Sequence, residues 1–170
     1  QLSWYRRDPR ITWLDASGRE ADLTRVVLRL PSFWYLTERY YEALYWLERV
    51  EATDDATRIV LLRLTGQMAQ LVDRRDAAQL LDASLELARD AGDKYQEAEA
   101  RFHRGIMAED RGDYEAAANG IRDARELFAS ADNALGITQC DYHLGVVAIG
   151  QRNLDAAERL LDSSIAAARY

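Results

Sequence analysis

The chain has 170 residues, a formal net charge of −7 and a sequence pI near 4.9, with charged residues at 30 % and only 2 Pro. Phosphate binding needs clustered Lys and Arg, so we expect no direct contact with nucleic acid. No stretch of about 18 or more apolar residues predicts a membrane span, and the abundance of Ala, Leu, Arg, Glu and Asp predicts helix almost throughout.

The chain looks like a cytoplasmic fragment of a longer protein. Its single cysteine, Cys140, cannot form an internal disulfide, and no signal peptide is recognisable. Cys140 has no basic neighbour in sequence that would lower the thiol pKa, so we predict that it is a packing residue. The chain starts at Gln1 and stops at Tyr170 inside a predicted helix, without a polar capping element. Other domains of the same longer chain are therefore expected partners.

The amino-terminal part divides into a lead-in and a degraded first unit. Residues 1–18 contain a proline and a glycine without a sustained helical period, so they are predicted to be a lead-in segment. The apolar pattern then becomes helical, and Pro31 is expected to kink or restart the first helix. A second helix is predicted over residues 40–50, which would complete a first helix pair within residues 19–52.

Aromatic residues crowd this part of the chain. They could form a core that caps the array or a docking face for another domain, since Trp and Tyr anchor interfaces at low entropy cost. We expect a mixture in which core packing dominates. The residues are Trp4, Tyr5, Trp13, Phe33, Trp34, Tyr35, Tyr40, Tyr41, Tyr45 and Trp46.

The remaining chain repeats itself every 40 residues. The matching sets are Thr65, Gly105 and Gly145; Ala77, Ala117 and Ala157; Leu81, Ile121 and Leu161; and Ser84, Ala124 and Ser164. The predicted helices are 55–71 and 76–91, 94–110 and 114–129, and 134–149 and 155–169, in units 55–92, 93–131 and 133–170. Such units cannot bury their apolar faces alone, so they are expected to stack into one continuous array of antiparallel helix pairs.

Short turns are expected between the helices. Asp54 or Asp55 is a plausible cap for the helix that starts the second unit. Gly92 is expected to end that unit's second helix. In the last unit, Gly150 and Asn153 are expected to supply left-handed backbone angles at the turn.

The segment RFHRGIMAEDRGDYEAAANGIRDARELF resembles a tetratricopeptide repeat. Gly105 occupies the small position of the first helix, residues 112–114 the turn, and Ala117 and Ala124 the small positions of the second helix. HLGVVAIGQRNLDAAERLLDSSI repeats the pattern. The resemblance implies that residues 19–170 form an all-α, right-handed superhelical array of about four units. The aromatic expected early in the first helix is absent, the usual late Pro is missing, and the period is 40 residues where about 34 is usual.

The region WLDASGREADLTRVVLRLPSFWYLTERYYEALYWLERV, followed by these repeats, resembles the tail behind the ATPase core of STAND-type bacterial regulators, such as large LuxR-type and antibiotic-regulator-type transcription activators. This resemblance implies a sensor or protein-interaction segment of a signalling or transcriptional regulator. The nucleotide and DNA sites of such a protein would lie outside this chain.

In tetratricopeptide arrays the first helix of each unit lines the concave face and contacts the ligand. The resemblance places twelve residues there, namely Ile59, Leu62, Gly66, Ala69, Glu99, Phe102, Ile106, Glu109, Gln139, Tyr142, Val146 and Ile149. We expect most of them to form an apolar groove for a peptide or protein. Alternatively, Phe102 and Ile106 pack between neighbouring helices. The nine that we expect to contact a partner are Leu62, Gly66, Phe102, Ile106, Glu109, Gln139, Tyr142, Val146 and Ile149.

No catalytic, metal or cofactor site is predicted. The sequence contains no P-loop, HExxH motif, paired cysteines or nucleophile elbow, so we expect a non-enzymatic protein that needs no cofactor. His103 and His143 lie one period apart, about two helix layers, which is too far for a shared metal ion. We expect them to be surface or interface histidines.

Two other functions remain open. A small-effector sensor would need a deep pocket with convergent polar groups near Glu109, Gln139 and Tyr142. A self-assembly module would pair through the exposed ends of the array to form a homo-oligomer.

Overall fold

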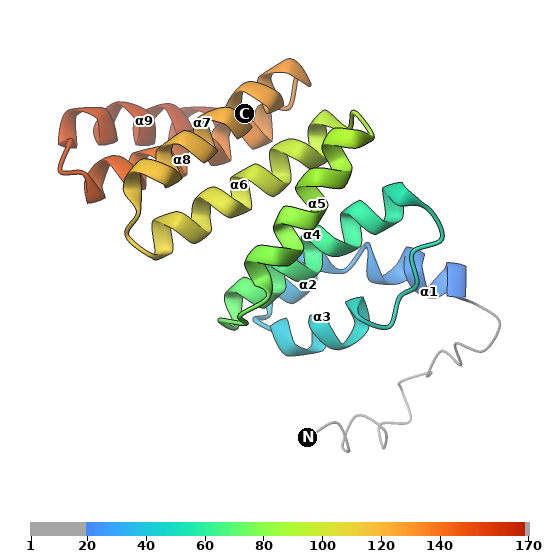
Figure 1. The fold of residues 1–170 in the computed structure, drawn as a ribbon. Helices are drawn as coiled ribbons and strands as arrows, with labels where there is room; N and C mark the ends of the chain where they lie inside the picture. The colour runs from blue at the N-terminus through green and yellow to red at the C-terminus, as the bar shows by residue number, and fades with distance from the viewer. Residues whose placement is uncertain (1–19, 169–170) are drawn as a thin grey trace.

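The computed structural model describes residues 20–168, and every secondary-structure element in this range is an α-helix (Figure 1). The nine helices are α1 (Glu20–Val27), α2 (Pro31–Leu36), α3 (Tyr40–Leu47), α4 (Asp55–Leu71), α5 (Ala77–Asp90), α6 (Lys94–Asp110), α7 (Tyr114–Ser130), α8 (Ala134–Gly150) and α9 (Leu154–Ala167). None of these helices combines the length and apolar character that a membrane crossing needs.

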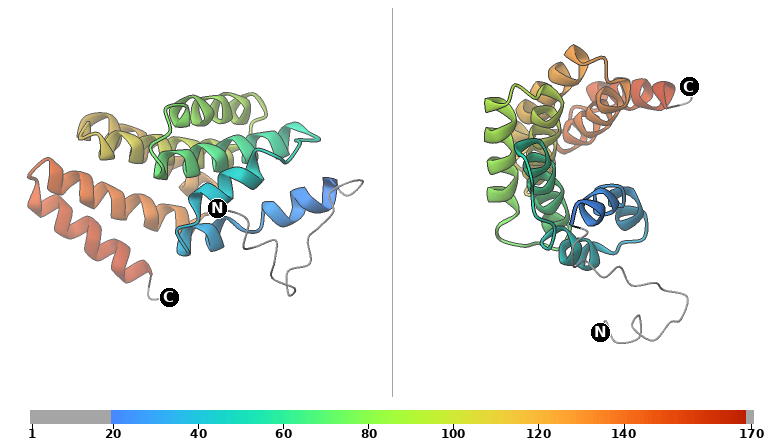
Figure 2. Two further views of the ribbon diagram at one scale, coloured as in Figure 1. Left: turned by 90° about the horizontal axis from the view of Figure 1, so that it is seen from below. Right: turned by 90° about the vertical axis from the view of Figure 1, so that its right-hand side faces the viewer.

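Helices α4 to α9 form three antiparallel pairs that stack one after another (Figures 1 and 2). Each helix packs on the next one in the chain, and α4, α6 and α8 also contact one another in that order. The predicted fold class, an all-α superhelical array of helix pairs, is therefore confirmed. Because stacked pairs follow a curve, one side of the array is concave, and this side holds the groove described below.

A small residue at each crossing lets the two helices of a pair approach closely. A Cβ atom added to Gly105 would lie 2.5 Å from Cγ1 of Ile121, and one added to Gly145 would lie 2.7 Å from Cγ of Leu161. The predicted steric role of these glycines is thus borne out. Each crossing buries an apolar side chain of the second helix against the bare backbone of the first.

In the second unit the small residue is Gly66, where the 40-residue spacing predicts Thr65. A Cβ added to Gly66 would lie 2.8 Å from Cγ of Leu81. The caps show the same offset, because the N-cap Asp93 follows the N-cap Asp54 by 39 residues, whereas Asn133 follows Asp93 by 40. Helix α4 is therefore one residue out of the 40-residue register.

The connections in the second half of the array repeat every 20 residues. The N-cap side chains of Asp93, Asp113, Asn133 and Asn153 each accept a hydrogen bond from the backbone N–H three residues later. The residue before each cap has a positive φ: Gly92, Gly112, Asp132 and Arg152. The cap residue's own N–H donates to a carbonyl five residues earlier, which closes the preceding helix.

The prediction for the last turn was wrong. Arg152, with φ of 58°, adopts the left-handed conformation, while Asn153 caps α9 with φ of −96°. Gly150 is the last residue of α8, and its Cα faces the ring of Tyr114. A Cβ at position 150 would collide with that ring, so the glycine is there for packing.

The amino-terminal part folds as three short helices. Pro31 starts α2, as expected for a proline that cannot continue α1. Trp34 is fully buried in a core cluster with Val27, Leu44 and Met68. Several other aromatic residues of the amino-terminal helices are exposed. The exposed ones are Phe33, Tyr35 and Tyr41. Core and surface aromatics are both found, but core packing does not dominate as predicted, because Trp34 is the only buried ring among the aromatics of residues 33–46. Trp4, Tyr5 and Trp13 and the whole lead-in lie outside the described residues.

Candidate functional site

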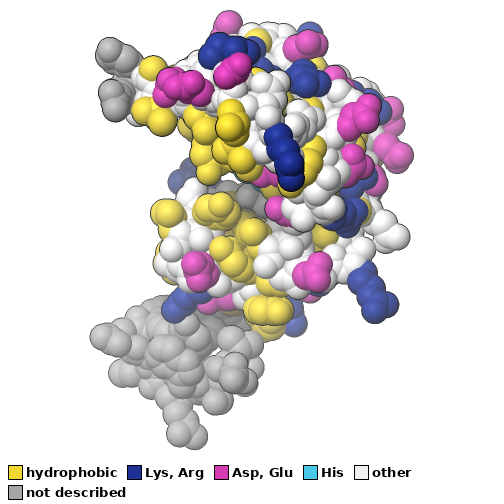
Figure 3. All heavy atoms as spheres, turned by 90° about the vertical axis from the view of Figure 1, so that its left-hand side faces the viewer, with side chains coloured by type: hydrophobic (Ala, Val, Ile, Leu, Met, Phe, Trp, Pro, Cys, Tyr) yellow, Lys and Arg dark blue, Asp and Glu magenta, His cyan; other side chains and the backbone are white. Residues whose placement is uncertain are grey.

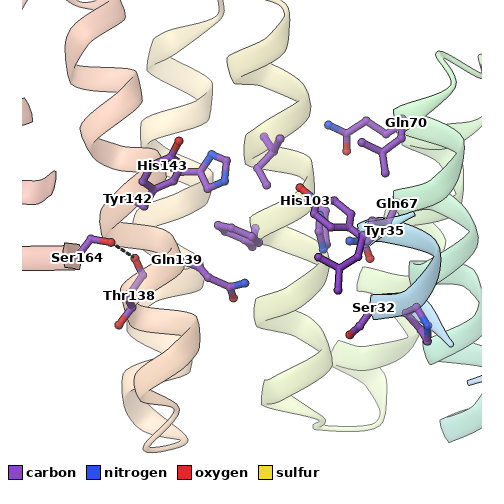
Figure 4. Close-up of a pocket in the computed structure, with 15 residues that line it drawn as sticks. Ser32, Tyr35, Gln67, Gln70, His103, Thr138, Gln139, Tyr142, His143 and Ser164 are labelled. Atoms are coloured by element: carbon purple, nitrogen blue, oxygen red, sulfur yellow. Dashed lines mark hydrogen bonds between the residues drawn. The ribbon is translucent and has the colours of Figure 1, made fainter. Parts of the chain in front are cut away.

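A groove on the concave side is lined by residues from α2, α4, α6, α8 and α9 (Figure 4). Its cavity volume is about 690 Å³. Figure 3 shows a face of the molecule on which hydrophobic side chains gather around a hollow. The lining residues are Pro31, Ser32, Tyr35, Leu36, Gln67, Gln70, Leu71, Phe102, His103, Ile106, Thr138, Gln139, Tyr142, His143 and Ser164.

A row of four rings runs along the floor of the groove from α6 to α8. Phe102 lies 5.4 Å from His103 and 5.2 Å from His143, centroid to centroid, and His143 lies 5.2 Å from Tyr142. All three contacts are edge-to-face, the arrangement that aromatic rings prefer. Phe102 is only 5 % exposed and Tyr142 is 50 % exposed. The row of rings therefore starts in the core and ends at the solvent-exposed ring of Tyr142.

The two histidines have different surroundings. Nδ1 of His143 lies 2.9 Å from Oε2 of Glu109, which links α8 to α6. His103 is buried, and burial together with the positive charge of Arg63 and the neighbouring His143 lowers the His103 pKa to about 3. Its Nε2 lies 3.9 Å from Oε2 of Glu99, too far for a hydrogen bond. The His103 imidazole is therefore neutral, and it is buried where a surface position was one of the two predicted alternatives.

The two imidazoles lie closer together than the predicted separation of two helix layers, because both contact one ring. The ring of Phe102 contacts both imidazoles. Among residues 20–168, no group of three or more His, Cys, Asp or Glu side chains is placed to hold a metal ion. The groove offers aromatic rings together with amide, hydroxyl and imidazole groups.

A polar network ties α4 to α6. The guanidinium of buried Arg63 donates to Oε1 of Gln96 at 2.9 Å and to Oε2 of Glu99 at 3.1 Å. By the register of Gly66 and Gly105, Arg63 occupies the position that Phe102 holds in α6. The network therefore fixes the spacing between the two helices that carry the groove's central part.

None of the described residues that line the groove is Asp, Glu, Lys or Arg. Several polar side chains there are already engaged: Gln70 donates to Asp110, Thr138 to the carbonyl of Ala134, and Ser164 to the carbonyl of Thr138. The amides of the half-buried Gln67 and the exposed Gln139 have no hydrogen-bond partner among the described residues. Figure 4 shows Gln139 reaching from α8 and Gln67 from α4 toward the space between these helices.

Comparison with known proteins supports the fold. No family model and no curated protein matches the chain significantly. Among solved structures, the chain is similar to the crystal structure of BtubC (BKLC) from P. vanneervenii, with a TM-score of 0.65 and 16 % sequence identity over 89 % of this chain. The match covers 66 % of BtubC, so the chain spans just under two thirds of that protein's length. At this identity the likeness shows a shared helical architecture.

Four of the nine residues predicted to contact a partner line the groove, namely Phe102, Ile106, Gln139 and Tyr142. Glu109 does not line it but bonds to His143. Val146 and Ile149 lie farther along α8 and are not among the lining residues. The alternative reading of Phe102 as a packing residue is also partly right, because its ring is almost fully buried.

The predictions for α4 were wrong by one residue. Gly66 is buried against Leu81, and Ile59 and Ala69 are also buried, while Leu62 does not line the groove. The groove residues of this helix are Gln67, Gln70 and Leu71. The reason is the register offset: a residue shifted by one position turns by about 100° around a helix.

The contribution of α2 was not predicted at all. Tyr35 and Leu36 form a wall opposite α8 because the short amino-terminal helices fold back beneath the array (Figure 2). No periodicity links this segment to the repeats, so sequence spacing could not place it. The offset of α4, by contrast, was detectable from the 39-residue spacing between Asp54 and Asp93.

Proposed function

We propose that this chain is a protein-interaction segment that binds a peptide or a segment of a partner protein in the concave groove. The observation that carries the proposal is the aromatic row, which ends in the half-exposed Tyr142 within a cavity of about 690 Å³ that no Asp, Glu, Lys or Arg lines among the described residues. Exposed apolar hollows of this kind on a highly charged protein are typical of contact sites. The segment would act by binding, without catalysis.

The cellular context is part of the same proposal. The resemblance to STAND-type regulators supports a cytoplasmic signalling or transcriptional protein, in which the groove would receive the signal and other domains would give the output. The likeness to BtubC supports only the helical-repeat architecture. The partner would then be another protein or another domain of the same longer chain.

Selection of displayed random peptides on the 170-residue chain tests this proposal. Selected peptides are titrated calorimetrically against wild type, Tyr142→Arg and the control Tyr41→Arg. Tyr41 is 76 % exposed and lies outside the groove, so both substitutions are expected to leave the fold intact. Loss of binding in Tyr142→Arg alone supports the groove. Equal binding by all three proteins would overturn the proposal.

A second function, self-assembly, is favoured by the last helix. Leu154 and Ile165 of α9 are 67 % and 53 % exposed. Their counterparts one period earlier are engaged with the next helix: Tyr114 packs on Gly150, and Arg125 bonds to Asp141. The face of α9 that continues this stacking is therefore open, and a second copy of the chain could cover it.

Light scattering over a concentration series tests self-assembly. If α9 pairs with a second copy, the mass of wild type rises with concentration, and Ile165→Glu remains monomeric. Leu135→Glu is the control, because Leu135 is also exposed but lies on α8 outside the groove. A wild-type mass that stays monomeric at every concentration rules this function out.

A further inference from the structure

Resting on the proposed function of the groove, we infer that its occupant is an uncharged, extended protein segment whose backbone is hydrogen-bonded by the side-chain amides of Gln67 and Gln139. The aromatic row then contacts the side chains of that segment. The inference depends on three features of the groove: its lack of charge, its two free amides and its width.

The lack of charge selects against ionised side chains in the bound segment. A charged group that enters the groove loses water, and no lining residue of opposite charge replaces that hydration. Two carboxylates beside the lining are already engaged, since Glu109 is bonded to His143 and Asp110 to Gln70. Charged flanks of the segment would therefore stay outside.

The two free amides indicate how the segment is held. A side-chain amide offers one acceptor oxygen and two N–H donors, so it can pair with both the N–H and the C=O of a peptide group. Gln67 reaches in from α4 and Gln139 from α8, and α6 lies between these two helices (Figure 4). Burying either amide beneath an apolar ligand would leave its polar atoms unpaired, at a cost of about 1 to 3 kcal/mol.

This cost distinguishes an extended segment from a helix. In a helix the backbone N–H and C=O groups are already bonded to one another, so they cannot serve the two glutamines. An extended segment has free N–H and C=O groups along its whole length. Amphipathic-helix partners, which lay an apolar face into such a groove, are therefore disfavoured.

The spacing of the helices sets the length of the segment. Neighbouring helices pack about 8 to 10 Å apart, so the distance from α4 across α6 to α8 is roughly 16 to 20 Å. By the register of the crossing glycines, Gln67 corresponds to Val146, which lies seven residues, or about 10 Å, beyond Gln139 along the helix axis. The direct span is then roughly 19 to 23 Å, so about six or seven residues of an extended chain, at about 3.3 Å each, bridge the two glutamines. Phe102, Ile106 and Tyr142 line the same groove and would contact the side chains of this stretch.

The decisive experiment uses peptides selected on the wild-type chain, with Gln67→Met, Gln139→Met and the control Gln79→Met. Methionine keeps the length of glutamine but removes both hydrogen-bonding groups, and Gln79 is exposed on α5 outside the groove. We expect uncharged cores in the selected peptides and a Kd raised about tenfold or more by each groove substitution, but not by Gln79→Met. N-methylation of the peptide group that Gln139 binds should lower the affinity of the selected peptide for the wild-type chain. The same methylation should change the affinity for Gln139→Met little, because that variant has already lost the hydrogen bond.

Three results would overturn the inference. Selected peptides with charged cores, or with apolar residues at helical spacing, would show the wrong partner class. Binding that is lost in Tyr142→Arg but unchanged in both glutamine variants would leave the proposed function standing and reject the role of the amides. Binding that is also unchanged in Tyr142→Arg would reject both the proposed function of the groove and the role of the amides. Thermal unfolding of each variant serves as the control that the variant is folded.

Discussion

Ile121 of α7 occupies the space that a side chain on Gly105 of α6 would need. An added Cβ would lie 2.5 Å from Cγ1 of Ile121 and 3.3 Å from its backbone nitrogen. The contact sits at the centre of the third unit, where the two helices cross. It makes Gly105 a position at which a single methyl group is expected to change the stability of the array.

Gly105→Ala should lower the free energy of unfolding by about 1 to 2 kcal/mol. Overpacking costs about 1 to 3 kcal/mol, and the better helix propensity of alanine returns up to about 1 kcal/mol. Gly120→Ala is the matched control, since its Cβ would meet nothing closer than 3.6 Å. In Gly120→Ala the free energy of unfolding should rise by about 0.5 to 1 kcal/mol. Urea unfolding measures both, and equal effects would contradict the packing argument.

Arg152→Gly should stabilise the chain by up to about 1 kcal/mol. Arg152 has φ of 58°, in the same place where the earlier turns carry Gly92 and Gly112. A residue with a Cβ pays about 1 to 2 kcal/mol for this conformation, and glycine avoids this cost but loses more backbone entropy on folding. Arg111→Gly, at a C-cap with φ of −86°, should destabilise instead. Urea unfolding midpoints that shift in the same direction for Arg152→Gly and Arg111→Gly would contradict this explanation.

His103 should make the protein less stable in mild acid. Its pKa is about 3 in the folded state and about 6.5 in the unfolded chain, so the unfolded state binds the extra proton between these values. The free energy of unfolding therefore falls as the pH drops below about 6.5. Between about pH 7 and pH 5, His103→Gln should lose about 2 kcal/mol less than wild type. Parallel pH profiles for the two proteins would show that the imidazole can be protonated in place.

Cys140 should be unreactive until the chain unfolds. The thiol is fully buried, and burial raises its pKa to about 12. At about pH 8 the thiolate fraction is then more than about a thousandfold lower than that of a free cysteine. Modification by a chromogenic disulfide should be slow in buffer and fast in urea. Rapid labelling of the native chain would mean that α8 opens far more often than its packing suggests.

The secondary structure could be predicted largely from local residues. The predicted ranges 55–71 and 94–110 coincide with α4 and α6, because Asp54 and Asp93 cap these helices through their own side chains. The third helix pair was also placed to within one or two residues at each end. Caps, left-handed turn residues and apolar periodicity act over a few residues, so they can be read without knowing the fold.

The groove was only partly predictable. Phe102, Ile106, Gln139 and Tyr142 were placed correctly because α6 and α8 keep the 40-residue spacing. Helix α4 does not keep that spacing, so the prediction gave Gly66, which is buried, where Gln67 lines the groove. Whether Phe102 is core or surface could not be decided from spacing either, since one edge of a ring can line a cavity while the rest is buried.

The sequence by itself determined the helices of the three pairs, their pairing, and the small residues Gly105 and Gly145 at two of the three crossings, because these follow from contacts between residues close in the chain. Only the tertiary structure decided which face of α4 is exposed, that α2 forms a wall of the groove, and that His103 is buried and neutral. These features depend on how distant segments stack. A shift of one residue, or the position of one short helix, changes them without changing the local pattern.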